Sequence, residues 1–300
     1  MHLTFRMLQV FDAVARHLSY TRAAQELHLT QPAVSMQIRQ LEEATGVPLF
    51  EQLGKRIYLT RAGQEMHYYT HEIQRLLGEA ESVLSGLQGG TRGRLEISVA
   101  STANHFATRL LAAFARRYPD VSYSLDVTNR ETLVSQLVNN LKDLVLMGRP
   151  PPGLDLEVEA FMANPLVVIA PPDHPLARQE SVTLDQLQQE RFVVRERGSG
   201  TRIAMERFFE AQGIQLNTDL EMTSNEAIKQ AVQAGLGLGI VSIHTLEIEL
   251  EAGRLQVLDV EHFPILRHWY LVYRKGKRLS PVARNFRDFV LKHASSFVRQ

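Results

Sequence analysis

A strict heptad repeat over residues 62–87 is the feature that most limits how this chain can fold. Apolar residues recur there at intervals of 4, 3, 4, 3, 4, 3 and 4. They form one narrow stripe on a helix about 40 Å long, at ~1.5 Å per residue. Such a stripe is typical of two helices packed together, so we expect it to join two copies of the chain. A long helix lying on its own globular domain is the alternative. The repeat consists of Ala62, Met66, Tyr69, Ile73, Leu76, Ala80, Val83 and Leu87.

The predicted helix separates two unlike parts of the chain. Gly86, Gly89, Gly90 and Gly93 predict that it ends in a hinge. We therefore expect a small helical domain over residues 1–60, a linker helix with its hinge over 61–90, and a larger domain over 91–300.

Residues 20–39 predict two short helices joined by a tight turn. Ala23, Ala24 and Leu27 lie three to four positions apart, which puts them on one face of the first helix. Thr30 can cap the second helix, and Pro32 fits its first turn, where a missing N–H costs nothing. Small residues where two helices cross are what a helix-turn-helix needs, although an ordinary αα-hairpin gives the same pattern.

The second helix and the segment after it carry side chains suited to DNA. Residues 48–60 predict two short strands around Gly54 with a basic tip, so three helices and a hairpin would form a winged helix-turn-helix. Such a tip can contact phosphates, and it also occurs merely as a soluble surface. The candidate DNA-binding residues are Thr30, Gln31, Pro32, Ser35, Met36, Arg39, Lys55 and Arg56.

The charge and cysteine content limit the classes of partner. The net charge is zero, and residues 1–60 carry six Lys and Arg against five Asp and Glu. DNA affinity would therefore depend on where charges lie and on pairing two such domains. The chain has no cysteine, which excludes disulfides and thiolate metal sites. No secretion signal or bilayer-spanning apolar run is evident, so we expect a cytoplasmic protein without a membrane partner.

Residues 91–300 alternate between strands and helices. Repeated βαβ units predict parallel sheets with helices on both faces. About 210 residues is large for one such sheet, so we expect two α/β lobes. Lobe I would span about 91–162 and 267–300, and lobe II about 163–266.

Several of the predicted strand-to-helix turns carry hydroxyl, amide or guanidinium groups. In open α/β sheets such turns gather where ligands bind, and helix N-termini favour anions. As a set they predict a cleft for a small anionic metabolite, although any one of them also fits plain helix capping. The candidate effector-binding residues are Ser101, Thr102, Thr128, Arg149, Arg197, Ser199, Thr201, Arg202 and Asn225.

Signals of catalysis are absent from the sequence. The glycines over 235–239 precede a predicted strand, whereas a dinucleotide fingerprint follows one. The histidines are scattered, and no nucleophile is paired with a base. We expect no enzymatic activity, no metal site and no cofactor. An enzyme on the two lobes and a solute-binding module with a helical N-terminus remain the rival classes.

These motifs together resemble those of the LysR-type transcriptional regulators. The resemblance rests on AAQELHLTQPAVSMQIRQLE, on PLF followed by GKRIYLTRAG, on the heptad helix and on the two-lobed domain. It implies DNA contacts by Gln31, Pro32, Ser35, Arg39 and Arg56, and a sensor similar to type 2 periplasmic binding proteins. Two positions depart from the family pattern. His28 stands where glycine is common in the turn, and Gln52 stands where arginine is frequent.

Segments of the sensor resemble a narrower group within that family. RERGSGTRIAMERFF and SNEAIKQAVQAGLGLGIVSIHT are similar to the CbbR group, activators of RuBisCO and Calvin-cycle operons. The resemblance implies an activator, a homodimer or homotetramer, double-stranded DNA with a two-fold operator, and RNA polymerase as a further partner. It also implies a phosphorylated sugar, a nucleotide or another anion as effector. Regulation of a different metabolic operon is the alternative.

Overall fold

The computed structural model describes residues 3–54, 56–87 and 92–298. Contacts divide the chain into two compact units, Met1–Glu81 and Ser82–Gln300. Each unit is described by itself. Among the described residues, no helix has both the length and the apolar character needed to cross a bilayer.

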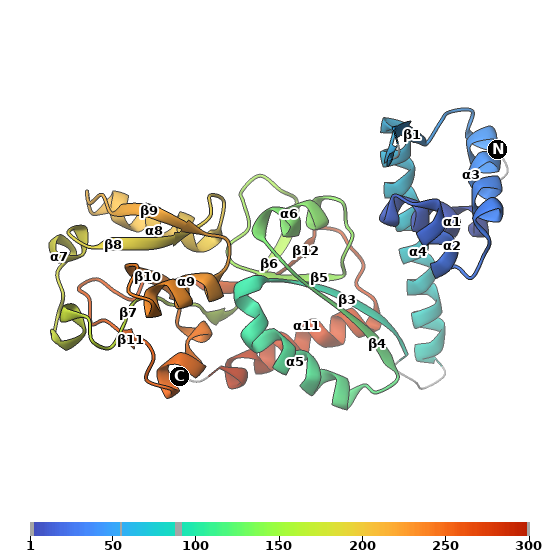
Figure 1. The fold of residues 1–300 in the computed structure, drawn as a ribbon. Helices are drawn as coiled ribbons and strands as arrows, with labels where there is room; N and C mark the ends of the chain where they lie inside the picture. The colour runs from blue at the N-terminus through green and yellow to red at the C-terminus, as the bar shows by residue number, and fades with distance from the viewer. Residues whose placement is uncertain (1–2, 55, 88–91, 299–300) are drawn as a thin grey trace. The chain divides into compact units, whose positions relative to one another are not determined.

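The first unit begins with three helices around a small apolar core (Figure 1). Thr4, Ser19 and Thr30 each cap one of them, because their hydroxyls accept a backbone N–H of the first turn. Val34, Ile38 and Leu41 are buried, which turns the opposite face of the third helix outward. The helices are α1 (Phe5–His17), α2 (Tyr20–Glu26) and α3 (Gln31–Thr45).

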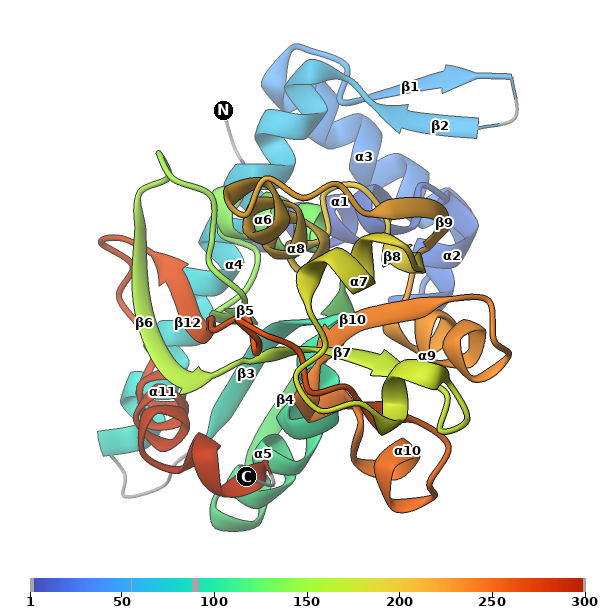
Figure 2. The same cartoon turned by 90° about the vertical axis from the view of Figure 1, so that its left-hand side faces the viewer.

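A hairpin and a long helix complete the first unit. Strands β1 (Phe50–Leu53) and β2 (Arg56–Leu59) pair antiparallel and project as a narrow arm (Figure 2). Helix α4 (Arg61–Leu87) follows directly, as the heptad repeat predicts. Ala62 and Met66 of its stripe pack against the core of the first unit, whereas Tyr69, Ile73 and Leu76 are 59%, 44% and 54% exposed. The predicted hinge residues 88–91 lie outside the described residues.

Lobe I of the second unit is a five-stranded sheet in the order β4-β3-β5-β12-β6. Helices α5 and α11 cover one face of this sheet and α6 the other (Figure 1). The strands are β3 (Gly93–Ala100), β4 (Val121–Thr128), β5 (Leu144–Met147), β6 (Leu156–Ala163) and β12 (His268–Arg274). The helices are α5 (Asn104–Arg117), α6 (Arg130–Val138) and α11 (Pro281–His293).

Lobe II is a second five-stranded sheet, in the order β11-β7-β10-β8-β9. Its apolar residues form one cluster on each face, with α8 on one side and α9 on the other. The strands are β7 (Leu166–Ala170), β8 (Arg191–Arg195), β9 (Asn217–Met222), β10 (Leu238–Ser242) and β11 (Gln256–Val257). The helices are α7 (Leu184–Gln188), α8 (Gly200–Ala211), α9 (Asn225–Gln233) and α10 (Glu247–Glu251).

The expectation of parallel sheets is wrong for part of each lobe. The pairs β3–β4, β3–β5, β8–β9 and β8–β10 are parallel. In contrast, β12 runs antiparallel to β5 and β6, and β7 runs antiparallel to β10 and β11. These antiparallel strands adjoin the segments where the chain passes between the lobes, so no helical crossover links them to their neighbours.

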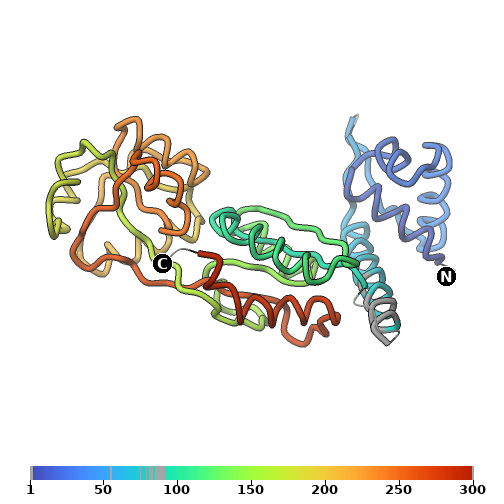
Figure 3. Tube along the Cα trace, turned by 90° about the horizontal axis from the view of Figure 1, so that it is seen from below, coloured from blue at the N-terminus to red at the C-terminus, as the bar shows by residue number. Residues whose placement is uncertain are grey.

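Two crossing segments connect the lobes, and they are hydrogen-bonded to each other (Figure 3). The N–H of Asn164 donates to the carbonyl of Arg267 over 2.7 Å. Leu166 and Ile265 exchange two backbone hydrogen bonds of 3.0 Å each. The return of β12 and α11 to lobe I confirms the predicted two-lobed architecture.

Candidate functional site

The exposed face of α3 carries most of the candidate DNA-binding residues. Gln31 and Ser35 are joined by a hydrogen bond of 2.9 Å from Nε2 to Oγ. Met36 is 54% exposed, and Arg39 is paired with Glu43 in the open. Thr30 caps the helix through its hydroxyl, and Pro32 lies in the first turn. This face is free to enter a major groove, which accepts one helix.

The hairpin presents Arg56 at its tip as an exposed side chain. Lys55 lies outside the described residues. Gln52 donates a hydrogen bond of 2.9 Å to the carbonyl of Gly54, so it supports the turn. His28, between α2 and α3, has a φ of +53°, the left-handed region for which glycine is the usual choice.

A polar cluster connects α1 to the linker helix within the first unit. Arg16 Nε lies 3.0 Å from one carboxylate oxygen of Asp12, and His67 Nε2 lies 3.3 Å from the other. Burial raises the pKa of Asp12, but its contacts with His67 and Arg16 outweigh that effect. The pKa therefore lies below its ordinary value.

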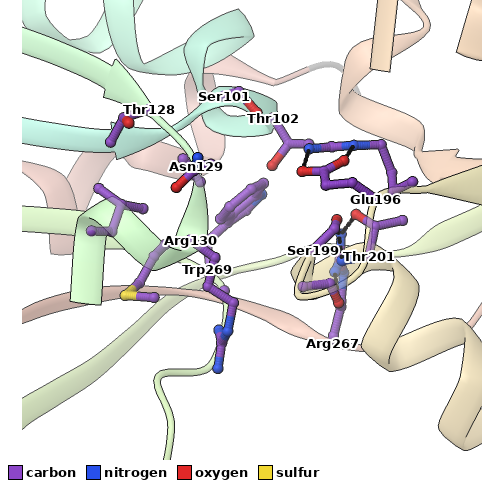
Figure 4. A pocket seen from close by; sticks show the side chains of 16 residues that line it. Ser101, Thr102, Thr128, Asn129, Arg130, Glu196, Ser199, Thr201, Arg267 and Trp269 are labelled. Atoms are coloured by element: carbon purple, nitrogen blue, oxygen red, sulfur yellow. Dashed lines mark hydrogen bonds and ion pairs between the residues drawn. The ribbon is translucent and has the colours of Figure 1, made fainter. Parts of the chain in front are cut away.

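A cavity lies between lobe I and lobe II (Figure 4). The space between its walls, open mouth and adjoining solvent included, is about 460 Å³. Five predicted residues line it, and they come from both lobes: Ser101, Thr102, Thr128, Ser199 and Thr201. Ser199 also caps α8, since its hydroxyl accepts the N–H of Thr201 over 3.3 Å. The N-terminal end of α8 therefore faces the cavity.

Arg267 supplies one of the positive charges of this site. Its guanidinium donates to the carbonyl of Gly200 over 3.1 Å and to the hydroxyl of Thr201 over 3.2 Å. Its Nε is buried without a hydrogen-bond partner. Burial, together with the nearby charge of Arg195, lowers the pKa of Arg267 to about 10. A bound anion would relieve both effects.

Arg195 is the second buried guanidinium of the cavity. Its side chain is 5% exposed and donates to Glu196 and to Asn225 Oδ1. Arg130, on the lobe I side, donates to the carbonyl of Arg149 over 2.6 Å. The described residues that line the cavity thus include three arginines but only one carboxylate, that of Glu196.

Four predicted effector residues do not line the cavity. Arg149 is linked to the lining by its backbone carbonyl, which accepts a hydrogen bond from Arg130. Arg197 is exposed and follows the lining residue Glu196 in the chain. Arg202 pairs with Glu206 and Glu221 and donates to the backbone carbonyl of Arg195, outside the lining. Asn225 stands behind the lining, where it holds Arg195.

Sequence reasoning missed Arg130, Arg195, Glu196, Arg267 and Trp269, which all line the cavity. The sequence did contain a signal for Arg195, which directly follows the apolar run Phe192–Val194. A guanidinium at the end of a buried strand needs a partner, and this need marks Arg195 as a candidate site residue. No such signal was present for Arg267, because it follows no turn at a strand end. Within the described residues, no cluster of three or more His, Cys, Asp or Glu could hold a metal ion.

Comparisons with known proteins match both units. Residues 5–64 match the family described as "Bacterial regulatory helix-turn-helix protein, lysR family", and residues 88–295 match "LysR substrate binding domain". A "RuBisCO operon transcriptional regulator" from Allochromatium vinosum is 59% identical over 98% of each chain. The "HTH-type transcriptional activator CmpR" of a Synechocystis strain is 46% identical over 97% of this chain and 95% of its own.

A solved structure extends the comparison to the sensor. The regulatory domain of CcmR from Synechocystis PCC6803, "in complex with 2-PG", is 42% identical and has a TM-score of 0.64. It covers 66% of this chain and 95% of its own length. With a helix-turn-helix, a linker helix and a two-lobed sensor matched along nearly the whole chain, this protein belongs to the LysR family of transcriptional regulators.

Proposed function

We propose that this protein activates RuBisCO or other CO₂-fixation genes in response to a small phosphorylated anion bound between its lobes. The relative named as a regulator of the RuBisCO operon supports the choice of genes, because it matches this chain over nearly its full length. The 2-PG complex of CcmR supports the class of effector.

The guanidinium of Arg267, which is half-buried and whose Nε is shielded from water, carries the effector assignment. Among the described residues it has no carboxylate within ion-pair distance, and a second guanidinium lies close enough to lower its pKa. A buried charge of this kind is costly unless it is paired. The N-terminus of α8 adds N–H groups and a positive helix end on the same side. A phosphate or carboxylate satisfies all of these groups at once.

DNA binding is assigned to residues 1–60 and pairing of two copies to the linker helix over 61–90. The proposed contacts are those of α3 and the hairpin, with Ser35 and Arg39 at the centre. The exposed stripe on α4 supports pairing, because bare apolar residues at heptad spacing favour a second helix. Two copies would then read two half-sites of an operator. The sensor, residues 91–300, binds ligand with a different affinity in each arrangement of the two DNA-binding domains. Ligand binding therefore shifts the protein toward the arrangement that binds it more tightly.

Further parts of the proposal concern the assembly and the setting of the protein. We assign it a dimer or tetramer, RNA polymerase as a partner during activation, a cytoplasmic location, and no enzymatic activity of its own. The family supports these assignments, since its members are regulators that act on DNA.

Calorimetric titration tests the effector assignment. The probe is 2-phosphoglycolate, a small phosphate monoester that also carries a carboxylate, in a buffer free of phosphate and sulfate. Arg267→Gln should weaken binding at least tenfold, because it removes a charge-assisted contact worth about 1.5–3 kcal/mol. Arg267→Lys, which keeps the charge, should lose less. Arg202→Gln is the matched control on α8, outside the lining, and should stay within about threefold of wild type.

Two outcomes would refute the effector assignment: no binding to the wild type, or equal losses in Arg267→Gln and Arg202→Gln. Footprinting on DNA upstream of a RuBisCO operon of the same genome, with and without the probe, tests the choice of genes. Protection of that region no stronger than of random duplex would refute it.

A further inference from the structure

Glu196 is the one carboxylate among the described residues that line the cavity, whose other charged groups are Arg130, Arg195 and Arg267. A site for anions gains nothing from a negative charge on its own wall, because that charge repels the ligand. The position of Glu196 therefore needs a reason of its own.

Glu196 occupies the side of Arg195 that an anion would use. Its two carboxylate oxygens accept hydrogen bonds of 2.7 Å from Nε and 2.8 Å from Nη2 of Arg195. This two-point contact is the geometry by which arginine binds carboxylates and phosphates. The remaining nitrogen, Nη1, donates to Asn225 Oδ1 over 2.9 Å. Glu196 thus takes the place on Arg195 that the oxygens of an anion would take.

The two partners differ in their freedom to move. Arg195 ends strand β8, is 5% exposed, and is held from behind by Asn225. Glu196 is 24% exposed and lies on the segment between β8 and α8. Its backbone N–H donates to the carbonyl of Met222, and among the described residues its carboxylate pairs with Arg195 alone. The carboxylate can turn into water, whereas the guanidinium cannot.

Arg195 and Glu196 line the cavity together with Thr102 of lobe I. Arg267 instead binds Gly200 and Thr201 at the start of α8, where Ser199 also lines the cavity (Figure 4). Besides Arg130, the cavity therefore has two cationic positions, those of Arg195 and Arg267. That of Arg267 has no carboxylate of its own, and that of Arg195 is occupied by Glu196. A ligand with two anionic groups, such as a phosphate and a carboxylate, matches two positions.

We propose that Glu196 is an internal competitor for the anionic effector, which must displace it from Arg195 before the cavity is filled. Glu196 therefore sets the concentration at which the sensor responds, and it disfavours anions too weakly charged to displace it. This inference rests on the proposed function, because it concerns the same cavity and the same class of ligand.

Titration of the full chain with Glu196→Gln tests the inference. The substitution keeps the size of the side chain and one acceptor for Arg195 but removes the negative charge. We expect 2-phosphoglycolate to bind at least fivefold more tightly to Glu196→Gln than to wild type. Inorganic phosphate should show a gain in the same direction. Glu196→Asp keeps the charge and should bind no more tightly than wild type.

Glu206→Gln is the matched control, because Glu206 also pairs with an arginine but lies on α8 outside the lining. It should change the affinity less than twofold. Thermal unfolding of each variant separates a change in affinity from a loss of folding.

The results distinguish this inference from the proposed function. If wild type binds the probe and Glu196→Gln binds it equally or more weakly, the competitor role is refuted while the effector class stands. Weaker binding would instead mean that Glu196 accepts a hydrogen bond from the ligand. If neither protein binds either probe, the effector class fails and the competitor role with it.

Discussion

Gly63 offers the sharpest test of how the hairpin is joined to the linker helix. A Cβ added at this position on α4 would lie 2.0 Å from the carbonyl oxygen of Leu49 and 3.0 Å from Leu59 Cδ2. The oxygen is a backbone atom, so no rotamer change can relieve the contact. It also accepts the N–H of Thr60 over 3.0 Å, and the Thr60 hydroxyl donates to the carbonyl of Pro48 over 2.8 Å. Moving the oxygen therefore breaks the junction between hairpin and helix.

The expected cost of Gly63→Ala follows from this contact. Overpacking a core costs typically about 1–3 kcal/mol, and a contact with fixed backbone belongs at the upper end, so we expect about 3 kcal/mol. Gly78 lies on the same helix, with no atom within 4 Å of an added Cβ. Gly78→Ala should therefore stabilise the helix by about 0.5–1 kcal/mol, because alanine is the better helix former.

Amide hydrogen exchange read by mass spectrometry assigns these effects to the first unit. Peptides from α1 and α3 should lose about a hundredfold of protection in Gly63→Ala, since about 1.4 kcal/mol corresponds to a factor of ten. Peptides from the sensor should be unchanged. Equal protection in Gly63→Ala and Gly78→Ala would refute the reasoning, because it would mean that the helix and the hairpin are not packed at this point.

Three further predictions address the two units separately. Ser35→Ala or Arg39→Ala should weaken operator binding about tenfold without changing the oligomer, as gel-shift and sedimentation measurements would show; unchanged footprints would contradict the assignment of α3. The lowered pKa of Asp12 contributes stability that is complete above its ordinary pKa of about 4 and is lost as the pH falls through the lower folded value. The stability of the first unit should therefore depend less steeply on acid pH in Asp12→Asn, and identical acid-unfolding curves would contradict this. The carboxylate of Glu249 is 12% exposed and lies 2.8 Å from the Lys229 ammonium, a partner that Lys229→Ala removes. The sensor should therefore lose about 3 kcal/mol of stability in a urea titration, and a loss below 1 kcal/mol would contradict this.

The helices were the most predictable part of the fold, because their ends are encoded locally. Thr30 with Pro32 starts α3, and Pro281 lies in the first turn of α11, where the capping hydroxyl is that of the preceding serine. The direction of β7 and β12 was not predictable in the same way. Each strand is an apolar run like its neighbours, and its direction depends on where the chain crosses between lobes.

The cavity was predictable to the extent that its residues follow strand ends. Ser101, Thr128 and Ser199 were found because hydroxyls at strand-to-helix turns are visible in a sequence. The arginines that line the cavity were not found, because proximity in sequence does not say which way a long side chain points. Arg202 lies three residues from Ser199 but is not part of the lining, whereas Arg267, from the distant return crossing, is.

The path of the chain through the two lobes has a consequence for how the sensor signals. The strand that follows the linker helix, β3, and the last long helix, α11, both belong to lobe I. Lobe II is therefore an insertion, entered once and left once through the two hydrogen-bonded crossings. Its movements can reach the linker of the same chain only through lobe I or through non-covalent contacts. Lobe II is not covalently joined to the linker helix. Its surface can therefore change to bind new ligands while the attachment to the DNA-binding half stays the same.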